Sequence, residues 1–323
     1  MQPSPDERIL VTGGAGFLGS HLTRQLLADG YQVGVVDNLS FGRRAHLPTG
    51  HPWLHFAAID IRQRTELAAF FAAFRPQAVI HLAALHFIPY CNAHPVEAAE
   101  VNILGTDNVL ACCEMAGPQA VFVASTAAVY AVNDEANAET SVIGPTDIYG
   151  LTKYTCERLA ELHQRRSNGR VAAGRLFNIY GPNETNPHVI PEIVAQVKAG
   201  ASRIELGNIE PKRDFIHTSD VVGAIRAILA AARRWPAPGF EVFNIGSGVE
   251  YSVAEIVQLC AELTGRDIRI VQTAERIRRV ERMHLAADIS RLQAATGWRP
   301  QMDLRAGLAE LLTINSQQST VNG

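Results

Sequence analysis

The chain has 323 residues, of which 47% are hydrophobic and 19% charged, and its formal net charge is −3. This composition is typical of a globular protein with a sizeable core, and the lack of a basic run argues against nucleic acid or an anionic membrane as a partner. No apolar stretch approaches the ~20 residues of a membrane span, and the opening residues do not resemble a signal peptide. The five cysteines are odd in number and lack CxxC spacing, so we expect reduced thiols and a cytoplasmic protein.

The first predicted unit is a buried strand followed by a glycine-rich turn. The aliphatic run at residues 9–11 is typical of such a strand. Two overlapping glycine spacings follow it, Gly13-x-x-Gly16-x-x-Gly19 and Gly14-x-Gly16-x-x-Gly19. The second matches the dinucleotide fingerprint, in which glycines make the turn, admit a pyrophosphate to a helix N-terminus and let that helix pack on its strand.

The segments after this turn complete a dinucleotide-binding unit. Residues 17–29 have leucines on one helical face, and Gly30 follows as a C-terminal stop. The next strand, 32–36, ends in Asp37, about 20 residues beyond the loop, as expected of an acid that binds a ribose. Because strand, loop, helix, strand and acid occur in order, the sequence predicts a Rossmann-type site.

Strands and helices keep alternating beyond Asp37. Further strands are predicted at 53–59, 78–82, 120–124 and 171–177, and helices at 67–74, 95–116 and 146–166. This alternation predicts an α/β fold with a Rossmann-type, doubly wound parallel sheet and right-handed crossovers. We assign it to an NAD-binding domain spanning residues 1–180.

The rhythm changes at the turn-rich segment 180–187, where a second lobe is predicted to begin. We expect residues 181–315 to form mainly a smaller, mixed α/β lobe that binds substrate, with some chain returning to the first domain. Its elements are a strand at 203–206, a helix at 220–232 and a helix opened by the capping box Ser252-x-x-Glu255. Residues 316–323 are polar and predicted to be a disordered tail.

A candidate catalytic pair lies on the helix predicted at 146–166. Tyr149 and Lys153 are four residues apart and therefore share one helical face. A nearby ammonium and a positive nicotinamide ring both favour phenolate, so Tyr149 is a candidate for removing a proton from a sugar hydroxyl. A core tyrosine beside a solvated lysine is the alternative. The strand upstream ends in Ser125 and Thr126, at the edge where α/β sheets bind ligands, and we favour Thr126 for orienting a substrate oxygen.

These residues belong to a set of motifs that extends over nearly the whole chain. The set, in order, is Thr12-Gly-Gly-Ala-Gly-Phe-Leu-Gly19, Asp37-Asn38, Asp60-Ile61, His81-Leu-Ala-Ala84, Asn102 with Gly105-Thr106, Ser125-Thr126-x-x-Val-Tyr130, Tyr149-x-x-x-Lys153, Arg175-Leu-Phe-Asn178-x-Tyr-Gly-Pro182, Arg213-Asp-Phe215, Phe243-Asn-Ile-Gly-Ser247 and the segment from Arg278 to Asp288. The chain thereby resembles the extended short-chain dehydrogenase/reductases, and within them the NAD-dependent nucleotide-sugar epimerases of the UDP-glucose 4-epimerase type.

The resemblance implies a role for each matching position. It implies that Thr126, Tyr149 and Lys153 are catalytic. It implies NAD contacts, with ribose at Asp37 and adenine at Asp60 and Ile61, from Gly13, Gly16, Phe17, Leu18, Asp37, Asn38, Asp60, Ile61, Leu82, Ala83, Ala84, Asn102, Ser125, Tyr149 and Lys153. The implied contacts to a nucleotide sugar, a UDP-sugar by preference, are His86, Thr126, Asn178, Val189, Arg213, Arg278 and Glu281.

A homodimer is expected on the helices at 95–116 and 146–166, and the resemblance implies the same contact. These helices carry more apolar surface than one sheet face needs to cover. The residues that contribute it are Val96, Ala99, Ile103, Leu151, Cys156 and Leu159.

The residue types suit the roles at the cofactor and the substrate. Arg213 and Arg278 offer the charge-assisted donors that a diphosphate needs. Asp37 should repel a 2′-phosphate and so favours NAD over NADP, although Arg43 and Arg44 follow closely. No histidine shows metal-ligand spacing with cysteine or carboxylate, so no metal site is predicted.

Two departures from the family pattern concern the sugar side. Glu281 stands where the family usually has aspartate at the nucleotide ribose, and the loop at 86–94 replaces a segment that often carries lysine and serine. His86 or Cys91 in this loop is a candidate contact to an unusual sugar group, with a packed histidine and a buried thiol as the alternative.

Four functions fit these residues to different degrees. Epimerisation at C4 through a transient 4-keto sugar is favoured. A 4,6-dehydratase needs an acid and a base beside the threonine, where this chain has Ala127 and Ala128. A nucleotide-sugar 4-ketoreductase is the third function, and a non-catalytic, dinucleotide-sensing binding protein is the fourth. The sugar, the base and the carbon inverted stay open.

Overall fold

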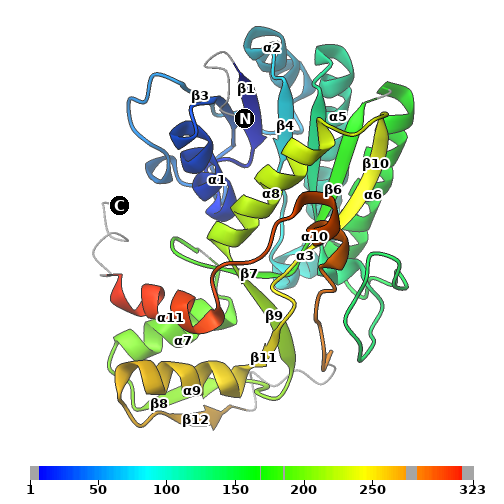
Figure 1. The fold of residues 1–323 in the computed structure, drawn as a ribbon. Coiled ribbons are helices and arrows are strands. Elements are labelled where there is room, and N and C mark those ends of the chain that lie inside the picture. The colour runs from blue at the N-terminus through cyan, green and yellow to red at the C-terminus, as the bar shows by residue number, and fades with distance from the viewer. Residues whose placement is uncertain (1–6, 168, 185, 274–281, 315–323) are drawn as a thin grey trace.

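The computed structural model describes residues 7–167, 169–184, 186–273 and 282–314. Its centre is a seven-stranded sheet in the order β10-β6-β5-β4-β1-β2-β3 (Figure 1). All neighbouring strands of this sheet are parallel. The strands are β1 (Arg8–Thr12), β2 (Gln32–Val36), β3 (Leu54–Ala57), β4 (Ala78–His81), β5 (Ala120–Thr126), β6 (Arg170–Leu176) and β10 (Gly239–Ile245). The order reverses between β1 and β4, which is where a Rossmann sheet binds its ligand.

Helices cover both faces of the sheet because successive residues of each buried strand point to opposite sides. Ile9 and Val11 of β1 pack in one core with α1 (Phe17–Ala28) and α8 (Thr218–Ala232). Leu10, between them, packs in a second core on the other face. That core includes side chains of α2 (Arg64–Phe74), α5 (Gly105–Ala116) and α6 (Ile148–Ser167). The predicted doubly wound, Rossmann-type α/β fold is therefore confirmed.

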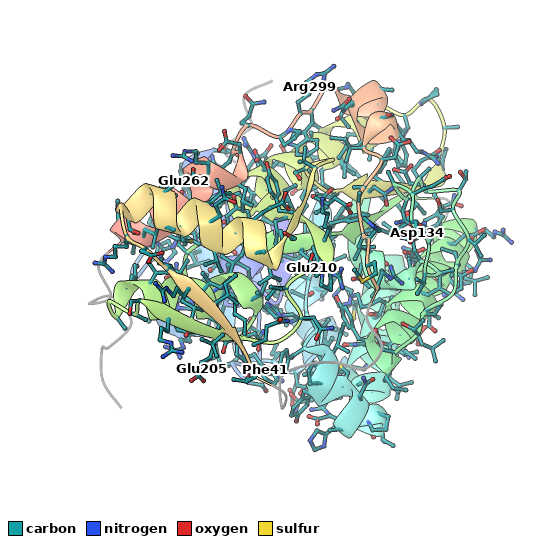
Figure 2. The ribbon with its side chains drawn as sticks, turned by 90° about the horizontal axis from the view of Figure 1, so that it is seen from below. Phe41, Asp134, Glu205, Glu210, Glu262 and Arg299 are labelled. Carbon is teal, nitrogen blue, oxygen red and sulfur yellow. The ribbon has the colours of Figure 1, made fainter. Side chains whose placement is uncertain are left out.

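A smaller mixed lobe follows β6 and lies below the sheet in Figure 1. Its strands are β7 (Asn178–Tyr180), β9 (Lys212–His217) and β11 (Glu250–Ser252) in one sheet, and β8 (Arg203–Leu206) with β12 (Arg269–Gln272) in another. Its helices are α7 (Val189–Lys198), α9 (Val253–Thr264) and α11 (Leu304–Thr313), which share one apolar core. Charged side chains such as Glu205, Glu262 and Arg299 lie around the outside (Figure 2).

Several elements differ from the sequence prediction. The helix predicted at 95–116 consists of α4 (Pro95–Ala99), a π-helical turn η2 (Glu100–Leu104) and α5. Short helices α3 (Ile88–Ala93), η1 (Arg44–His46), η3 (Ala127–Val129) and α10 (Ser290–Thr296) have no counterpart in the prediction. The capping box at Ser252 is present, with both of its hydrogen bonds. The predicted tail at 316–323 lies outside the described residues.

The second half of the chain contributes both to the smaller lobe and to the large sheet with its covering helices. β10 pairs with β6 at the edge of the large sheet, and α8 covers one face of that sheet. Among the described helices, none combines the length and the apolar character needed to cross a bilayer.

Candidate active site

The glycine-rich turn forms a cradle between β1 and α1. Gly13 has a φ of +71°, and a Cβ added there would lie 2.7 Å from the backbone nitrogen of Ala83. The turn therefore lies directly against the loop after β4, so that two segments predicted to contact NAD, the glycines and Leu82–Ala84, are neighbours. Gly16 is the N-cap of α1, whose first backbone N–H groups face this turn. Because glycine leaves open the space that a Cβ would fill, the cradle fits a dinucleotide pyrophosphate.

Asp37 closes the next side of the cradle. Its carboxylate, 7% exposed, accepts hydrogen bonds from the backbone nitrogens of Ala15 at 2.9 Å and Leu39 at 2.8 Å. Burial raises the pKa of Asp37, and these N–H donors oppose that rise. A carboxylate has about four acceptor positions, so acceptor capacity is left for ribose hydroxyls. Arg44, which could have served a 2′-phosphate, instead stacks its guanidinium on the Phe56 ring, with 4.9 Å to the centroid.

A charged cluster lies beyond β3, where the adenine contacts are expected. Asp60 accepts hydrogen bonds from Asn38 at 2.9 Å and from Arg62 at 2.7 Å. The Arg62 hydrogen bond is the main reason that the pKa of Asp60 is lowered to about 2. Ile61 is buried against Gly105 of α5. The structure thus brings Asn38, Asp60 and Ile61 together at one end of the cradle.

The candidate catalytic residues meet where α6 crosses the end of β5. Tyr149 and Lys153 are one turn apart on α6, and the Tyr149 phenol lies near the Thr126 side chain at the end of β5, close enough for Thr126 to influence its pKa. Gly150 makes this approach possible, because a Cβ there would lie 2.5 Å from the carbonyl oxygen of Ala128. The Lys153 side chain is buried beside them, 2% exposed. Thr126, Tyr149 and Lys153 therefore form one cluster, as the sequence predicted.

The sequence expectation for Tyr149 rests on the Lys153 ammonium and on a positive nicotinamide ring. In the protein alone, burial is the largest influence on the Tyr149 pKa and raises it, while the Thr126 side chain opposes this rise. Burial likewise lowers the pKa of Lys153, against the raising effect of Cys156 and Glu157. Desolvation of Tyr149 favours the neutral phenol, which is a proton donor as well as a candidate base.

Two residues expected to contact NAD use their side chains within the protein. The Ser125 hydroxyl donates to Glu157 Oε1 at 2.5 Å. The Asn102 amide donates to the Leu85 carbonyl oxygen and to Thr152 Oγ1, both at 2.9 Å, and accepts from the Leu85 backbone nitrogen. Both side chains are fully buried. We interpret them as supports for the strand end and for the loop after β4.

The sequence motifs include Thr12, His81 and Thr106, but sequence reasoning assigned no role to the buried hydrogen-bonded network that they form under the cradle. His81, fully buried at the end of β4, lies 2.6 Å from Thr12 Oγ1 and 2.9 Å from Thr106 Oγ1 through its two ring nitrogens. Burial lowers the pKa of His81 to about 3, so the ring is neutral. A histidine inside an otherwise apolar strand was the available signal. These hydrogen bonds link β1, β4 and α5 at the strand ends.

The predicted sugar-side residues lie in the second lobe or at its border. Asn178 begins β7, Arg213 lies on β9 and Val189 begins α7. His86 lies on the exposed loop after β4, with its Nε2 2.8 Å from Asn186 Nδ2. Arg278 and Glu281 lie outside the described residues.

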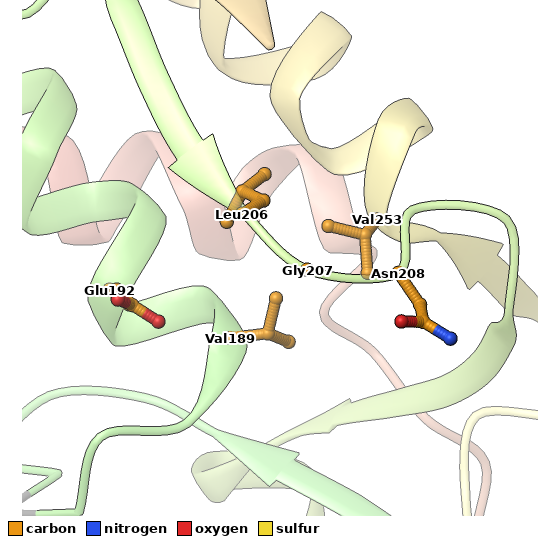
Figure 3. A pocket seen from close by; sticks show the side chains of 6 residues that line it. All are labelled: Val189, Glu192, Leu206, Gly207, Asn208 and Val253. Atoms are coloured by element: carbon orange, nitrogen blue, oxygen red, sulfur yellow. The ribbon is translucent and has the colours of Figure 1, made fainter. Parts of the chain in front are cut away.

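A cavity of about 290 Å³ opens at the start of α7. Besides Val189 it is lined by residues that the sequence did not indicate, namely Glu192, Leu206, Gly207, Asn208 and Val253 (Figure 3). These residues come from α7, the end of β8 and the start of α9, so no contiguous motif marks them. In the described part of the chain, no group of three or more histidine, cysteine or carboxylate side chains is arranged to hold a metal ion.

Comparisons with known proteins agree with this geometry. The model of the NAD dependent epimerase/dehydratase family matches residues 9–246. UDP-glucose 4-epimerase of Bacillus subtilis is 31% identical over 342 residues, covering 98% of this chain and 98% of the relative. GDP-6-deoxy-D-mannose reductase of Pseudomonas aeruginosa is 29% identical over 316 residues, covering 95% and 96%.

Solved structures with similar folds carry related ligands. UDP-glucose 4-epimerase of Thermotoga maritima, determined with UDP-glucose, superposes with a TM-score of 0.86 at 30% identity, covering 94% of this chain and 97% of that one. A dTDP-glucose 4,6-dehydratase of Streptomyces venezuelae, determined with NAD, gives a TM-score of 0.84 at 30% identity, covering 94% and 95%.

The chain belongs to the NAD dependent epimerase/dehydratase family, within the extended short-chain dehydrogenase/reductases. It is an NAD-dependent enzyme of the epimerase, dehydratase and reductase group that acts on nucleotide sugars.

Proposed function

We propose that this enzyme inverts C4 of a nucleotide-activated sugar, by preference a UDP-sugar, through a transient 4-keto sugar. The observation that carries the proposal is the cluster of Thr126 at the end of β5, Tyr149 at the start of α6 and buried Lys153 one turn along that helix, next to the glycine cradle. The likeness to UDP-glucose 4-epimerases supports the sugar and the reaction.

The residues around the cradle fit NAD, which supplies a reversible acceptor for hydride. The glycine turn and the N-terminus of α1 would hold the pyrophosphate, Asp37 a ribose, and Asn38, Asp60 and Ile61 the adenine end. Lys153 would hold the nicotinamide ribose. Phe17, Leu18 and Leu82–Ala84 would line the same cradle.

Tyr149 would exchange a proton with the sugar 4-hydroxyl. A positioned acid–base group of this kind contributes ~10²–10⁴-fold to a rate. Thr126 would orient the same oxygen, because its hydroxyl lies near Tyr149 at the end of β5. The Lys153 ammonium stabilises a phenolate when Tyr149 gives up its proton. Asn178, Val189 and Arg213 would hold the nucleotide sugar, and His86 would border the sugar.

The residues after Thr126 weigh against water elimination. Ala127 and Ala128 form the short helix η3, so the pair of ionisable side chains that an elimination needs is not at this position. A ketoreductase with net NAD(P)H turnover remains the second candidate, favoured by the likeness to a reductase.

A homodimer is proposed on the outer face of the helices at 95–116 and of α6. Large apolar side chains are exposed on these helices, among them Val96, Leu104, Met115, Leu151 and Leu162. The expectation for one residue of this surface is wrong: Cys156 is fully buried and faces the sheet. Light scattering at micromolar concentration should give the mass of two chains, and a monomer would contradict this assembly.

The redox balance of the reaction tests the proposed function. The purified protein is incubated with a panel of nucleotide sugars, without added NAD, and products are followed by proton NMR and mass. Epimerisation returns a sugar of unchanged mass inverted at one carbon, with no drift at the NADH absorbance. A product lighter by one water indicates a dehydratase. In a parallel incubation with a keto-sugar and added NADPH, stoichiometric consumption of the NADPH indicates a reductase. No turnover of any sugar, together with NAD binding, would favour a sensing protein.

A further inference from the structure

A buried ion pair lies one turn beyond the proposed catalytic pair. Glu157 follows Lys153 on α6 as Lys153 follows Tyr149, so the three side chains share one face of the helix. The Glu157 carboxylate binds the Arg175 guanidinium of β6 at two points, with Oε1–Nε at 2.9 Å and Oε2–Nη2 at 2.8 Å. The two side chains are only 3% and 5% exposed. Such a fork holds both groups in one orientation.

The pair is joined to the end of β5. The Ser125 hydroxyl donates to Glu157 Oε1 at 2.5 Å, and Ser125 lies opposite Arg175 in the register of β5 and β6. The next residue is Thr126, whose side chain lies near Tyr149 of α6. The last two residues of β5 thus both adjoin α6: Ser125 is hydrogen-bonded to Glu157, and Thr126 lies near Tyr149.

Stability alone is a poor explanation for this pair. Desolvation of two charges offsets most of their attraction, and apolar side chains of similar volume often serve equally well in a core. The Arg175 guanidinium is held further by Tyr130, whose hydroxyl accepts from Nη1 at 3.0 Å, and by the Glu139 carbonyl oxygen, also at 3.0 Å. These contacts orient the fork rather than merely neutralise a charge.

We propose that Glu157 is a positioning residue of the active site. Held by Arg175, it fixes Ser125 and thereby the direction in which Thr126 presents its hydroxyl to Tyr149 and to the reacting sugar. Neither Glu157 nor Arg175 touches substrate in this arrangement; they act through the strand end. The inference rests on the proposed function, because it assumes that Thr126 and Tyr149 act on the sugar.

The first test compares two buried hydroxyls that contact the same ion pair. Ser125→Ala removes the hydroxyl that connects the pair to β5, and Tyr130→Phe removes the one on the far side of Arg175. The melting temperatures of both variants should fall by similar amounts. Ser125→Ala should lower kcat about 10-fold at unchanged KM and NAD content, since small displacements of reacting groups cost about 10²-fold or less. Tyr130→Phe should stay within about twofold of wild-type kcat.

The second test removes the ion pair without leaving an unpaired charge. Glu157→Leu and Arg175→Met are introduced together, because either alone would bury an uncompensated charge or leave one unpaired, and leucine offers the Ser125 hydroxyl no acceptor. This double variant should lower kcat about as much as Ser125→Ala, and adding Ser125→Ala to it should lower kcat no further, as expected for one shared link. If the reductions in kcat multiply when Ser125→Ala is combined with the double variant, the inference is overturned. It is also overturned if Ser125→Ala alone has wild-type kcat or loses bound NAD.

A crystal structure of Ser125→Ala gives a reading that needs no turnover. The Thr126 hydroxyl should change its direction relative to the Tyr149 hydroxyl, and an unchanged arrangement of the two would overturn the inference. A wild-type protein inactive on every nucleotide sugar would instead defeat the proposed function, so the two failures are distinguishable.

Discussion

The proposed cofactor half and the proposed sugar half of the site are built differently. In the cofactor half, polar side chains at the ends of buried parallel strands are hydrogen-bonded within the protein, as in Thr12 and His81 with Thr106 of α5. In the sugar half, Asn178 and Arg213 lie on short strands of a small sheet. The cavity there is lined from two helix starts and a strand end.

We infer from this difference where activity is decided within the family. The reductase aligns with this chain in sequence over nearly the whole length, and the dehydratase does so in structure, yet the reactions in their names differ. On the proposed assignment, a common cofactor half would serve each of these reactions. The residues after Thr126 and those of the second lobe would then select the reaction and the sugar. The following changes test this division, from the largest expected effect to the smallest.

Tyr149→Phe removes the proposed acid–base group and should lower turnover by at least ~10², the usual scale for such a group. The fold and the bound NAD should be retained, because the ring still fills its place. Product formation per bound NAD is the measurement. Near-wild-type turnover in a pure sample would exclude Tyr149 from the mechanism and place the chemistry elsewhere.

Gly13→Ala should break the cofactor half selectively. Alanine at this position would be strained by the left-handed backbone conformation, and its Cβ would overlap Ala83. The amount of NAD carried through purification should therefore fall at least about 10-fold, which corresponds to a loss of about one to two kcal/mol in binding free energy. Gly117→Ala is the matched control, because its φ is +63° but no atom lies within 4 Å of the added Cβ. It should cost stability, about 1 kcal/mol, and leave NAD content unchanged. Equal NAD loss in both would contradict a cradle that depends on close approach.

Arg213→Gln should weaken the sugar half and spare the cofactor half. Loss of a charge-assisted donor to the diphosphate should raise KM for the nucleotide sugar about 10-fold, at unchanged NAD content. Arg203→Gln, on the exposed face of β8 in the same lobe, is the control and should leave KM unchanged. If kcat falls instead while KM holds, Arg213 acts in the transition state rather than in binding.

The same division explains what the sequence could predict. The glycine turn, Asp37 and the Tyr149–Lys153 pair are local patterns whose spacing expresses strand and helix geometry directly, so they could be read without coordinates. The Glu157–Arg175 pair and the cavity at Val189 depend on contacts between distant segments, and no spacing encodes them. The pKa of Tyr149 is a related case: the sequence shows its charged neighbour but not its burial, which is the largest influence on that pKa in the protein alone.

The smallest expected effect concerns the charged cluster at the adenine end. The pKa of Asp60 is lowered from 3.8 to about 2, chiefly by Arg62, so its ionised form is favoured by folding. This contribution is fully present above the unfolded pKa and is lost as the pH falls from about 4 through about 2. Because Arg62 is partly exposed, solvent screening should keep the contribution below about 1 kcal/mol. Asp60→Asn should therefore melt slightly below the wild type at about pH 6, and the difference should shrink steadily toward about pH 3. A difference that is constant with pH would mean that the Asn38 and Arg62 contacts act as neutral hydrogen bonds, and that charge contributes nothing to this end of the cofactor half.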